Sequence, residues 1–513
     1  MFTQRELPNS IRRPLIHGNG RLGRIPLALT LLVVINTSLY GQKQQAIKRL
    51  DGSTITPAEV DETVSRLMKA AEVTGAGIAI LNNGEITYLK AYGFRDKEKN
   101  LPLTIDSVMS AASFTKVAFT YLVMQLVDEG LLNLDKPVYQ YLPKSLPGFP
   151  NYADLANDPR YKLITARMLL DHTSGFANWR AYEDDHKLRI HFTPGARFAY
   201  SGEGIVLLQL VVQTITQKPL EELMQQQVFG PLGMDRTGMV WSNQFDSDFA
   251  NGYDEYGRSL GPDRRTTADA AGSMQTTVSD FARFMEGVMA GTRLRPATRE
   301  QMLSAQIVIN SKHEFPTLSE ETTDQNRAIH LSYGLGWGLY WTPKSEVFFK
   351  EGHDVGWRNY TVCFDRSKTG IVIMTNSGNG EGIFKDLLET LLKDTYTPIE
   401  WEGYTPYDKL PPRPPLKKHN VVAVDPAILQ GYVGRFLIPP DVAPNVVLTV
   451  RWEGKHLTVQ ENDEPKQDLV PESKTQFFTI AEDAYTFETD DQGRVTRLVL
   501  HADGRDVPAT LIK

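Results

Sequence analysis

The sequence predicts an α+β domain, in which helices flank an antiparallel sheet, followed by a small all-β domain. Three observations favour this architecture: helical spacing and a hairpin signal occur together in the first part of the chain, a proline-rich stretch follows, and only short strand-like runs occur beyond it. The chain has 513 residues, too many for one ordinary domain. Its 41% hydrophobic and 23% charged residues are typical of globular proteins.

The first domain is expected to begin with a helix and a hairpin. Thr56-Pro57-Ala58-Glu59 is a capping box with proline at the first helical position, and apolar residues follow it at helical spacing. Residues 76–81 and 85–92 are strand-like, and Asn82-Asn83-Gly84 between them is a strong hairpin signal. This order predicts a helix that leads directly into a β-hairpin.

Later segments supply further helices and the last strands of this domain. A helix is expected from Ser113 to Glu129, because Gly130 is a natural C-terminal stop. The pattern also predicts helices at residues 205–217 and 278–290 and a strand pair at residues 360–364 and 369–375.

A change in composition near residue 401 marks the end of the first domain. Five prolines between residues 406 and 415 predict an extended linker over residues 401–420. Short strand-like runs then flank turns such as Glu453-Gly454. We therefore expect a large α+β domain over residues 42–400 and a small all-β domain over residues 421–513.

Residues 1–41 have the order of a secretory signal peptide. Five arginines precede an apolar run from Ile25 to Ile35, and small or polar residues continue to Gly41. Cleavage there would start the mature chain at Gln42. An uncleaved membrane anchor is the alternative, although the run is shorter than the about 20 apolar residues of a membrane span. In both cases we expect an exported protein, either periplasmic or extracellular in a bacterium.

Composition also restricts the partners. The net charge is −7 and no block of Lys and Arg occurs, which argues against nucleic acid. No His, Cys and Glu cluster has zinc-ligand spacing, so we expect no metal and no cofactor. Cys363 is the only cysteine and lies in an apolar run, so it is expected to pack in a strand. An exported chain without disulfides fits a bacterial periplasm or exterior.

The segment Ser113-Phe114-Thr115-Lys116 carries the predicted chemistry. A serine hydroxyl is a poor nucleophile until a base removes its proton. Residues three apart share one face of a helix, so Lys116 can reach the Ser113 oxygen. A helix start also directs free N–H groups at developing negative charge. These relations suit a serine nucleophile with a lysine base one helical turn later. An isolated S-x-x-K pattern also occurs by chance on solvated helix faces, so the surrounding motifs decide between the two interpretations.

Several ordered motifs resemble the serine β-lactamase-like family, the group with class C β-lactamases, low-molecular-weight penicillin-binding proteins and related esterases. The resemblance covers about residues 56–396 and rests on Gly84-Glu85-Ile86, Ala91-Tyr92-Gly93-Phe94, Ser113-Phe114-Thr115-Lys116, Leu126-Val127-Asp128-Glu129-Gly130, Leu132–Val138, Met168–Gly175, Pro231-Leu232-Gly233-Met234 and Ala271-Gly272-Ser273-Met274. It implies a β-lactamase-like antiparallel sheet flanked by helices and an acyl-enzyme on Ser113. In that family the histidine corresponding to His172 is usually structural, so we expect a scaffold residue there and not a member of a triad.

The family's second motif, Y-x-N, falls at Tyr200-Ser201-Gly202. The resemblance implies that Tyr200 lies beside Ser113 and relays its proton, either as a phenolate or through Lys116. Gly202 replaces the asparagine that orients the substrate amide and the lysine in β-lactamases. Glu203, next to it, is a candidate for part of that role. The loss of the asparagine predicts weak β-lactam turnover.

The family's third motif, K-T-G or H-x-G, has two candidate positions here. Lys350-Glu351-Gly352 gives K-x-G directly, whereas a start at His353 puts valine where glycine is expected. We favour Lys350 as the third-motif cation. The resemblance then implies an oxyanion hole made by the backbone N–H groups of Ser113 and His353. Gly352 would be the strand residue at which the substrate meets the strand.

The C-terminal domain resembles the lipocalin-like β domain that often follows these hydrolases, through Tyr432-Val433-Gly434-Arg435-Phe436 and Leu469-Val470-Pro471. We expect a structural role for it. The complete pattern predicts a serine hydrolase for small esters, D-amino-acid peptides or β-lactams, with pocket walls from residues 176–192 and 308–329. Two alternatives stay open: a penicillin-recognising sensor on the same scaffold, and an interaction protein whose working part is the β domain.

Overall fold

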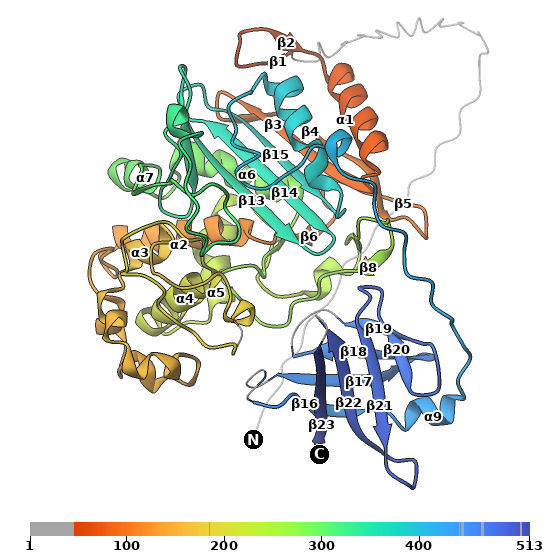
Figure 1. The fold of residues 1–513 in the computed structure, drawn as a ribbon. Helices are drawn as coiled ribbons and strands as arrows, with labels where there is room; N and C mark the ends of the chain where they lie inside the picture. The colour runs from red at the N-terminus through yellow and green to blue at the C-terminus, as the bar shows by residue number, and fades with distance from the viewer. Residues whose placement is uncertain are drawn as a thin grey trace, which may run out of the picture. The chain divides into compact units, whose positions relative to one another are not determined.

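The computed structural model describes residues 46–183, 185–440, 442, 446–462, 466–502 and 505–512. The first domain is built on one nine-stranded sheet in which all neighbouring strands are antiparallel (Figure 1). Its strands, in spatial order, are β10 (Ile307–Val308), β11 (Ser332–Tyr333), β12 (Gly338–Trp341), β13 (Glu346–Asp354), β14 (Trp357–Phe364), β15 (Thr369–Thr375), β3 (Gly75–Asn82), β4 (Glu85–Asp96) and β5 (Leu101–Pro102).

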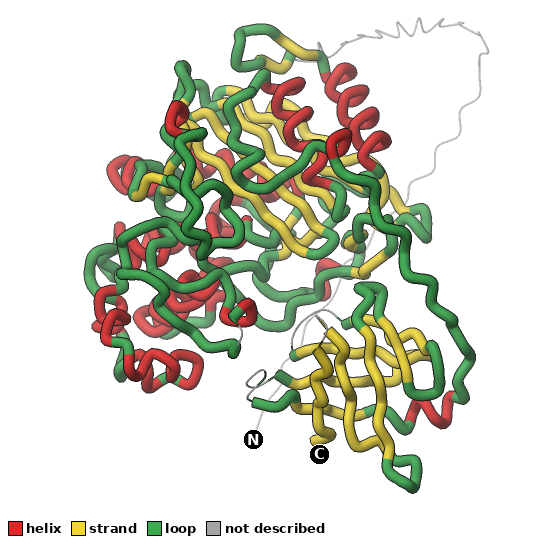
Figure 2. Tube along the Cα trace, in the orientation of Figure 1, coloured by secondary structure: helices red, strands yellow, loops and turns green. Residues whose placement is uncertain are grey.

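Helices cover both faces of this sheet (Figure 2). Residues alternate along β3, so that Ile78 and Ile80 pack on the side of α1 (Pro57–Ala71) and α8 (Phe384–Leu387), whereas Ala79 and Leu81 face the opposite core. That second core is larger. Its helices are α2 (Phe114–Asp128), α3 (Ala166–Leu170), α4 (Gly202–Thr216), α5 (Leu220–Met224) and α6 (Val278–Ala290), with α7 (Pro296–Met302) beside α2.

Local signals explain most of the elements. The Thr56 capping box is present, because Thr56 Oγ1 accepts from the Glu59 N–H while the Glu59 carboxylate accepts from the Thr56 N–H. The helix predicted at residues 278–290 has those bounds in α6. The helix predicted at residues 205–217 begins earlier, at Gly202, because Ser201 Oγ caps it by accepting from the Gly204 N–H.

Strand pairing brings distant segments together at the centre of the sheet. β15 pairs with β3 over residues 370–375 and 76–81, so the first hairpin of the domain lies beside its last strands. On the other side of β13, the pairing with β12 stops where Gly338, the first residue of β12, lies opposite Phe349. From Lys350 onward, β13 has no partner on that edge among the described strands. This open strand edge lies at the candidate site.

The segment predicted as a linker is only partly extended. Trp401, Glu402 and Tyr404 are buried, and two of them belong to the core on the α1 side of the sheet. The domain therefore continues past residue 400, and the exposed proline-rich stretch begins near Leu410. Aromatic packing overrides the polar composition of this segment.

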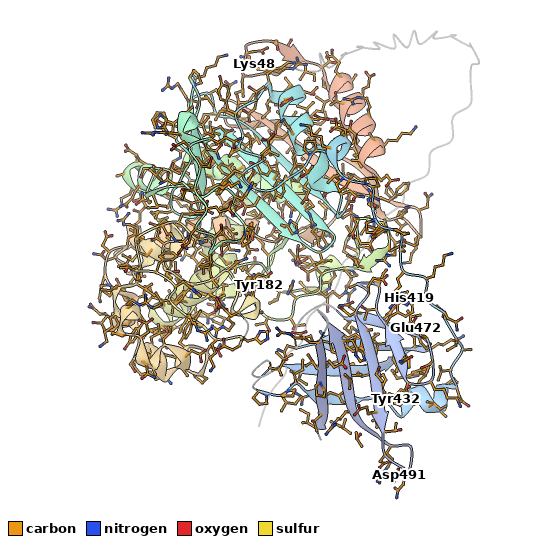
Figure 3. All side chains as sticks on the ribbon, in the orientation of Figure 1. Lys48, Tyr182, His419, Tyr432, Glu472 and Asp491 are labelled. Carbon is orange, nitrogen blue, oxygen red and sulfur yellow. The ribbon has the colours of Figure 1, made fainter. Side chains whose placement is uncertain are left out.

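The C-terminal domain is a closed eight-stranded antiparallel barrel, which bears out the predicted small all-β domain. Its strands are β16 (Gly434–Leu437), β17 (Val447–Glu453), β18 (His456–Glu461), β19 (Gln467–Pro471), β20 (Gln476–Phe478), β21 (Ala484–Thr489), β22 (Val495–Ala502) and β23 (Arg505–Ile512), preceded by α9 (Pro426–Gln430). His419 lies beside Glu472 at one end of the barrel (Figure 3).

The predicted signal peptide and its cleavage site at Gln42 lie outside the described residues. Within the part of the chain that the structure describes, no helix has the length and apolar character of a membrane span.

Candidate active site

The turn before α2 presents Ser113. Ala112 has the left-handed backbone angle φ +47°, which is uncommon for a residue with a side chain. The turn is held because Thr115 Oγ1 donates to the Ala112 carbonyl at 2.6 Å and accepts from the Met274 N–H at 3.0 Å. Ser113 is the N-terminal cap residue of α2, yet its side chain makes no capping bond. The hydroxyl is therefore available for chemistry.

Lys116 lies one helical turn later and reaches that hydroxyl, as its spacing predicts. Its Nζ is 2.9 Å from Ser113 Oγ and donates to the Ala271 carbonyl at 2.6 Å. The side chain is 2% exposed. Burial, followed by the nearby charge of Lys350, lowers the pKa of Lys116 to about 7. A substantial fraction of this amine is therefore unprotonated at neutral pH.

Tyr200 also contacts the serine. Its side chain is buried and hydrogen-bonded to the Ser113 side chain, and Lys350 Nζ donates to its oxygen at 3.2 Å. Lys116 Nζ is 5.0 Å from the ring centroid. Burial, with the Glu351 carboxylate, nevertheless raises the pKa of Tyr200 well above its ordinary value. Of the two roles that the sequence left open, this favours a neutral phenol that relays a proton over a phenolate base.

Lys350 occupies the inner end of the open edge of β13. Its side chain is fully buried, contacts Tyr200, and is ion-paired with Glu351. The backbone nearby is tight, because a Cβ at Gly352 would lie 2.7 Å from the Ala111 carbonyl oxygen. The strand and the nucleophile turn therefore approach each other at a residue where only glycine fits.

The His353 side chain does not join this group. It is 53% exposed, and its Nδ1 is 3.5 Å from a carboxylate oxygen of Glu381. The structure thus brings Ser113, Lys116, Tyr200 and Lys350 together and directs the His353 ring away. Lys350, not the His353 ring, has the position expected of the third-motif cation.

His172 packs behind Tyr200. The two ring centroids are 4.3 Å apart, and His172 Nδ1 accepts from the Ser201 N–H at 3.2 Å. Burial lowers the pKa of His172 well below its ordinary value, which favours a neutral ring. This geometry suits a scaffold residue that orients the Tyr200 segment.

Gly202 and Glu203 begin α4 just after Tyr200. A Cβ at Gly202 would lie 2.5 Å from two ring carbons of Trp179, so the indole fills the space of a side chain there. The Glu203 carboxylate pairs with Arg180 at 2.6 Å and is 7% exposed. Because that ion pair already engages Glu203, the suggestion that it replaces the missing asparagine is not supported by this geometry.

Sequence reasoning missed three features of the site. Ala112 and Thr115 shape the nucleophile turn, and Trp179 covers Gly202. Glu314, from the loop after β10, is 2% exposed, and neither of its carboxylate oxygens has a hydrogen-bond partner among the described residues. Burial and the neighbouring Glu351 raise the pKa of Glu314 well above its ordinary value. The only available signal was position, since Trp179 and Glu314 fall within the loops expected to line the pocket.

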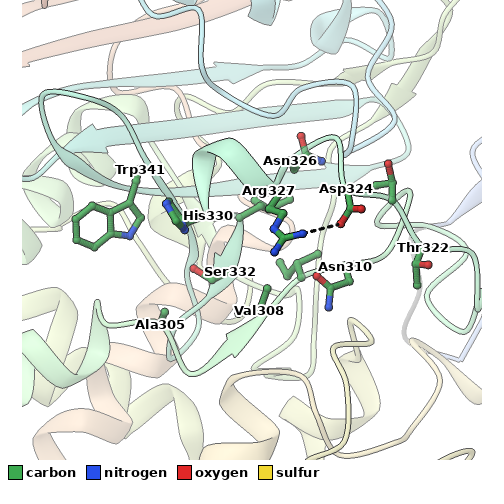
Figure 4. A pocket seen from close by; sticks show the side chains of 13 residues that line it. Ala305, Val308, Asn310, Thr322, Asp324, Asn326, Arg327, His330, Ser332 and Trp341 are labelled. Atoms are coloured by element: carbon green, nitrogen blue, oxygen red, sulfur yellow. Dashed lines mark ion pairs between the residues drawn. The ribbon is translucent and has the colours of Figure 1, made fainter.

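A separate cavity of about 1010 Å³ lies next to the edge strands β10 to β12 (Figure 4). Trp341, His330 and Arg327 are among its lining residues, and none of Ser113, Lys116, Tyr200 and Lys350 lines it. Among the described residues, no group of three or more His, Cys, Asp or Glu side chains is arranged to hold a metal ion.

Comparison with known proteins gives two family matches. The model described as Beta-lactamase matches residues 60–393, and the Domain of unknown function (DUF3471) matches residues 418–509. The chain is 25% identical over 473 residues to Penicillin-binding protein 4* of Bacillus subtilis (strain 168), which covers 84% of this chain and 93% of that protein. It is 30% identical over 217 residues to Esterase EstB of Burkholderia gladioli, over 37% of this chain and 53% of that protein.

The fold of both domains recurs in a solved structure. The octameric penicillin-binding protein homologue from Pyrococcus abyssi matches with a TM-score of 0.55 and 20% sequence identity, over 88% of this chain and 99% of that one. At this identity the match supports the fold alone. It agrees with the predicted arrangement of a helix-flanked antiparallel sheet followed by a barrel.

Proposed function

The chain belongs to the beta-lactamase family of serine hydrolases, and on this premise we propose that it is an exported ester hydrolase that works through an acyl-enzyme on Ser113. Lys116 is the base, Tyr200 relays the proton, and Lys350 is the supporting cation. Substrates of decreasing preference are small esters, D-amino-acid peptides and β-lactams. No metal or other cofactor takes part in these steps.

The observation that supports this best is the contact between the Ser113 hydroxyl, which makes no capping bond, and a buried amine. Lys116 Nζ lies 2.9 Å from Ser113 Oγ, and its pKa of about 7 makes it an effective base near neutral pH. A lysine with its ordinary pKa near 10.4 would be protonated under the same conditions. Burial therefore gives Lys116 the property that nucleophile activation requires.

The reaction follows from these contacts. The unprotonated Lys116 amine accepts the proton of the Ser113 hydroxyl as Oγ bonds to the substrate carbonyl carbon. The C–O bond to the leaving alcohol breaks, and the alcohol oxygen takes a proton from Lys116 through the Tyr200 hydroxyl. Water then attacks the acyl carbon and gives its proton to Lys116 through Tyr200. The bond between Ser113 Oγ and the acyl carbon breaks, Oγ takes that proton from Lys116, and the acid is released.

The negative oxygen formed in each addition step requires two donors. The backbone N–H groups of Ser113 and His353 are our candidates, since Gly352 permits the strand to approach the nucleophile turn. Loss of one such donor typically costs about 3–4 kcal/mol of transition-state stabilisation. Lys350 contributes through its charge, which opposes a second cation on Lys116, and through its Nζ, which donates to the oxygen of the neutral Tyr200.

Export follows from the N-terminal pattern and belongs to the proposal. We expect the mature chain to start at Gln42. Intact-mass measurement of protein recovered outside the cytoplasm tests this, and a mass that still includes residues 1–41 would indicate the anchor alternative.

The proposed activity is tested by comparing a 4-nitrophenyl ester with nitrocefin on purified protein. We expect higher kcat/KM for the ester, because Gly202 lacks the amide that orients β-lactams in relatives, and we expect Ser113→Ala to remove both activities. Ser304→Ala is the matched control, since Ser304 is exposed and lies outside the site. A clear preference for nitrocefin would contradict the proposed substrate order.

The same experiment addresses the alternative of a penicillin-recognising sensor. A sensor would be acylated at Ser113 by a penicillin and release the acyl group extremely slowly, with no turnover of any ester. That outcome would retain Ser113 as nucleophile and overturn the proposed hydrolase.

A further inference from the structure

The indole of Trp179 occupies the space that a side chain at residue 202, the start of α4, would take. A Cβ placed on Gly202 would lie 2.5 Å from Cη2 and Cζ2 of the Trp179 ring, closer than such atoms approach in proteins. Gly202 is two residues from Tyr200, whose oxygen bonds to the Ser113 and Lys350 side chains. The ring therefore lies at a wall of the site where relatives with the Y-x-N motif carry an asparagine.

This position of the ring is fixed by the backbone on either side of it. The Asn178 Oδ1 accepts from the Gly202 N–H at 3.0 Å, and the Asn178 carbonyl accepts from the Glu203 N–H at 3.1 Å. On the other side, the Arg180 N–H donates to the Glu203 carboxylate at 3.0 Å, and its guanidinium forms a bidentate pair with the same group. Trp179 is thus clamped from both neighbours, and its half-buried ring leaves part of its surface open.

A second aromatic ring contacts the Tyr200 segment from another loop. Phe315 is 45% exposed, and its ring centroid is 5.7 Å from that of Tyr200. The ring atoms of Trp179 nearest to Gly202 are carbons. An amide held there would lose its hydration without gaining a partner, whereas an alkyl or aryl group would bury apolar area against the ring.

We propose that Trp179 is a specificity-determining residue that selects acyl groups with an apolar chain or ring and disfavours those with an amide next to the reacting carbonyl. This inference rests on the proposed esterase function, since it concerns the acyl group attached to Ser113. It also accounts for Gly202, because the ring of Trp179 leaves no room for a side chain at that residue. The inferred substrate class is therefore aryl- or alkyl-alkanoate esters.

Two esters of equal chain length test the inference. In 4-nitrophenyl 4-phenylbutyrate the carbonyl carries a propylene chain to the phenyl ring, and in 4-nitrophenyl N-benzoylglycinate an amide replaces two of those carbons. We expect wild-type kcat/KM to be about 10- to 100-fold higher for the phenylbutyrate, the range for an unpartnered amide. Trp179→Ala should lower this ratio at least tenfold, chiefly by slowing the phenylbutyrate, and Trp179→Phe should preserve most of it.

Further variants separate a specific role from a structural one. Trp179→Gln supplies an amide in place of the ring and should improve the benzoylglycinate relative to the phenylbutyrate, as should Trp179→Ala combined with Gly202→Asn. Trp341→Ala is the matched control, because Trp341 is a 46% exposed tryptophan that lines a different cavity, and it should leave the ratio unchanged.

The outcomes distinguish this inference from the proposed function. If Trp179→Ala and Trp179→Gln both turn over the esters with the wild-type ratio, Trp179 does not set specificity and the inference is overturned. If the wild type hydrolyses neither ester, the proposed function fails first, and the inference fails with it.

Discussion

The site around Ser113 and the interior of the C-terminal barrel bury side chains of opposite kinds. The side chains buried around the site include five that can carry charge: Lys116, Lys350, Glu314, Glu351 and Glu402. In the part of the chain that the structure describes, neither carboxylate oxygen of Glu314 has a hydrogen-bond partner. The barrel core consists of aliphatic and aromatic residues such as Phe436, Phe487 and Leu498. Burying charge costs stability but shifts pKa values, whereas burying apolar area only stabilises. The difference indicates that chemistry shaped the first region and packing shaped the second.

The largest expected effect is on the base. Lys116→Ala should lower kcat/KM for a 4-nitrophenyl ester by at least about 10³-fold, because it removes the group that activates the nucleophile. In the wild type, kcat/KM should rise with pH through about 7, since the unprotonated amine is active and burial lowers the pKa of Lys116 to about 7. A pH–rate profile measures this, and a rate that is flat or falls across that range would contradict a lysine base.

The next effect compares two neighbours on β13. Lys350→Ala should lower kcat by about 10²-fold, since Lys350 contacts Tyr200 and supports the low pKa of Lys116. His353→Ala should change kcat less than about threefold, because its side chain is 53% exposed and only its N–H is required. Steady-state kinetics of both variants decide the matter. The reverse order would show that the third motif begins at His353.

A core substitution in the barrel should affect stability and spare catalysis. Leu498 is fully buried, so Leu498→Ala should destabilise the barrel by about 2–5 kcal/mol. At a temperature where the barrel remains folded, we expect acylation of Ser113 to change less than twofold. Calorimetry and ester kinetics on the same sample test this. A large loss of activity in the folded variant would assign the barrel a part in catalysis and would contradict a purely structural role for its core.

The smallest effect concerns the polar contacts of His419 at one end of the barrel. The His419 ring stacks on Phe478 and hydrogen-bonds Glu472 and Glu482, and the bond to Glu482, followed by that to Glu472, raises the pKa of His419. A raised pKa means that this stabilisation is complete below the ordinary histidine pKa near 6.5 and is lost as pH rises through the folded-state value.

His419→Gln should therefore reduce the stability of the barrel by less than about 1 kcal/mol, the scale of exposed ion pairs, and only at acidic pH. Thermal unfolding of both proteins between pH 5 and pH 8 measures the difference as a function of pH. A difference that grows toward pH 8 would have the wrong sign for this account.

Much of the fold could be predicted because local signals and tertiary packing agree. The capping box at Thr56 and the helix over residues 278–290 are local patterns, and both are present in the structure. Within the predicted linker, Trp401 and Tyr404 pack in the core on the α1 side of the sheet, which composition does not reveal. The nearby prolines predicted an extended backbone, and the packing of the two aromatic side chains determined where the extended segment begins.

The site shows the same division. The spacing of Ser113 and Lys116 on one helix face is a local relation, so sequence predicted their contact. Trp179 and Gly202 are 23 residues apart, and a loop brings the indole against the glycine. No periodic pattern in the sequence predicts this contact. The buried charge that tunes Lys116 is equally non-local, because Lys350 lies on a distant strand. Local spacing therefore predicted the contact between Ser113 and Lys116, whereas the loop contact of Trp179 with Gly202 has no local signal.

Trapping the acyl-enzyme tests the central claim most directly. The protein is mixed with a 4-nitrophenyl ester, quenched in acid during the steady state, and analysed by intact mass and peptide mapping. We predict one added acyl group on the peptide that contains Ser113, present in wild type and Ser304→Ala and absent in Ser113→Ala. An acyl group on a different residue, or ester hydrolysis by Ser113→Ala at the wild-type rate, would contradict the account.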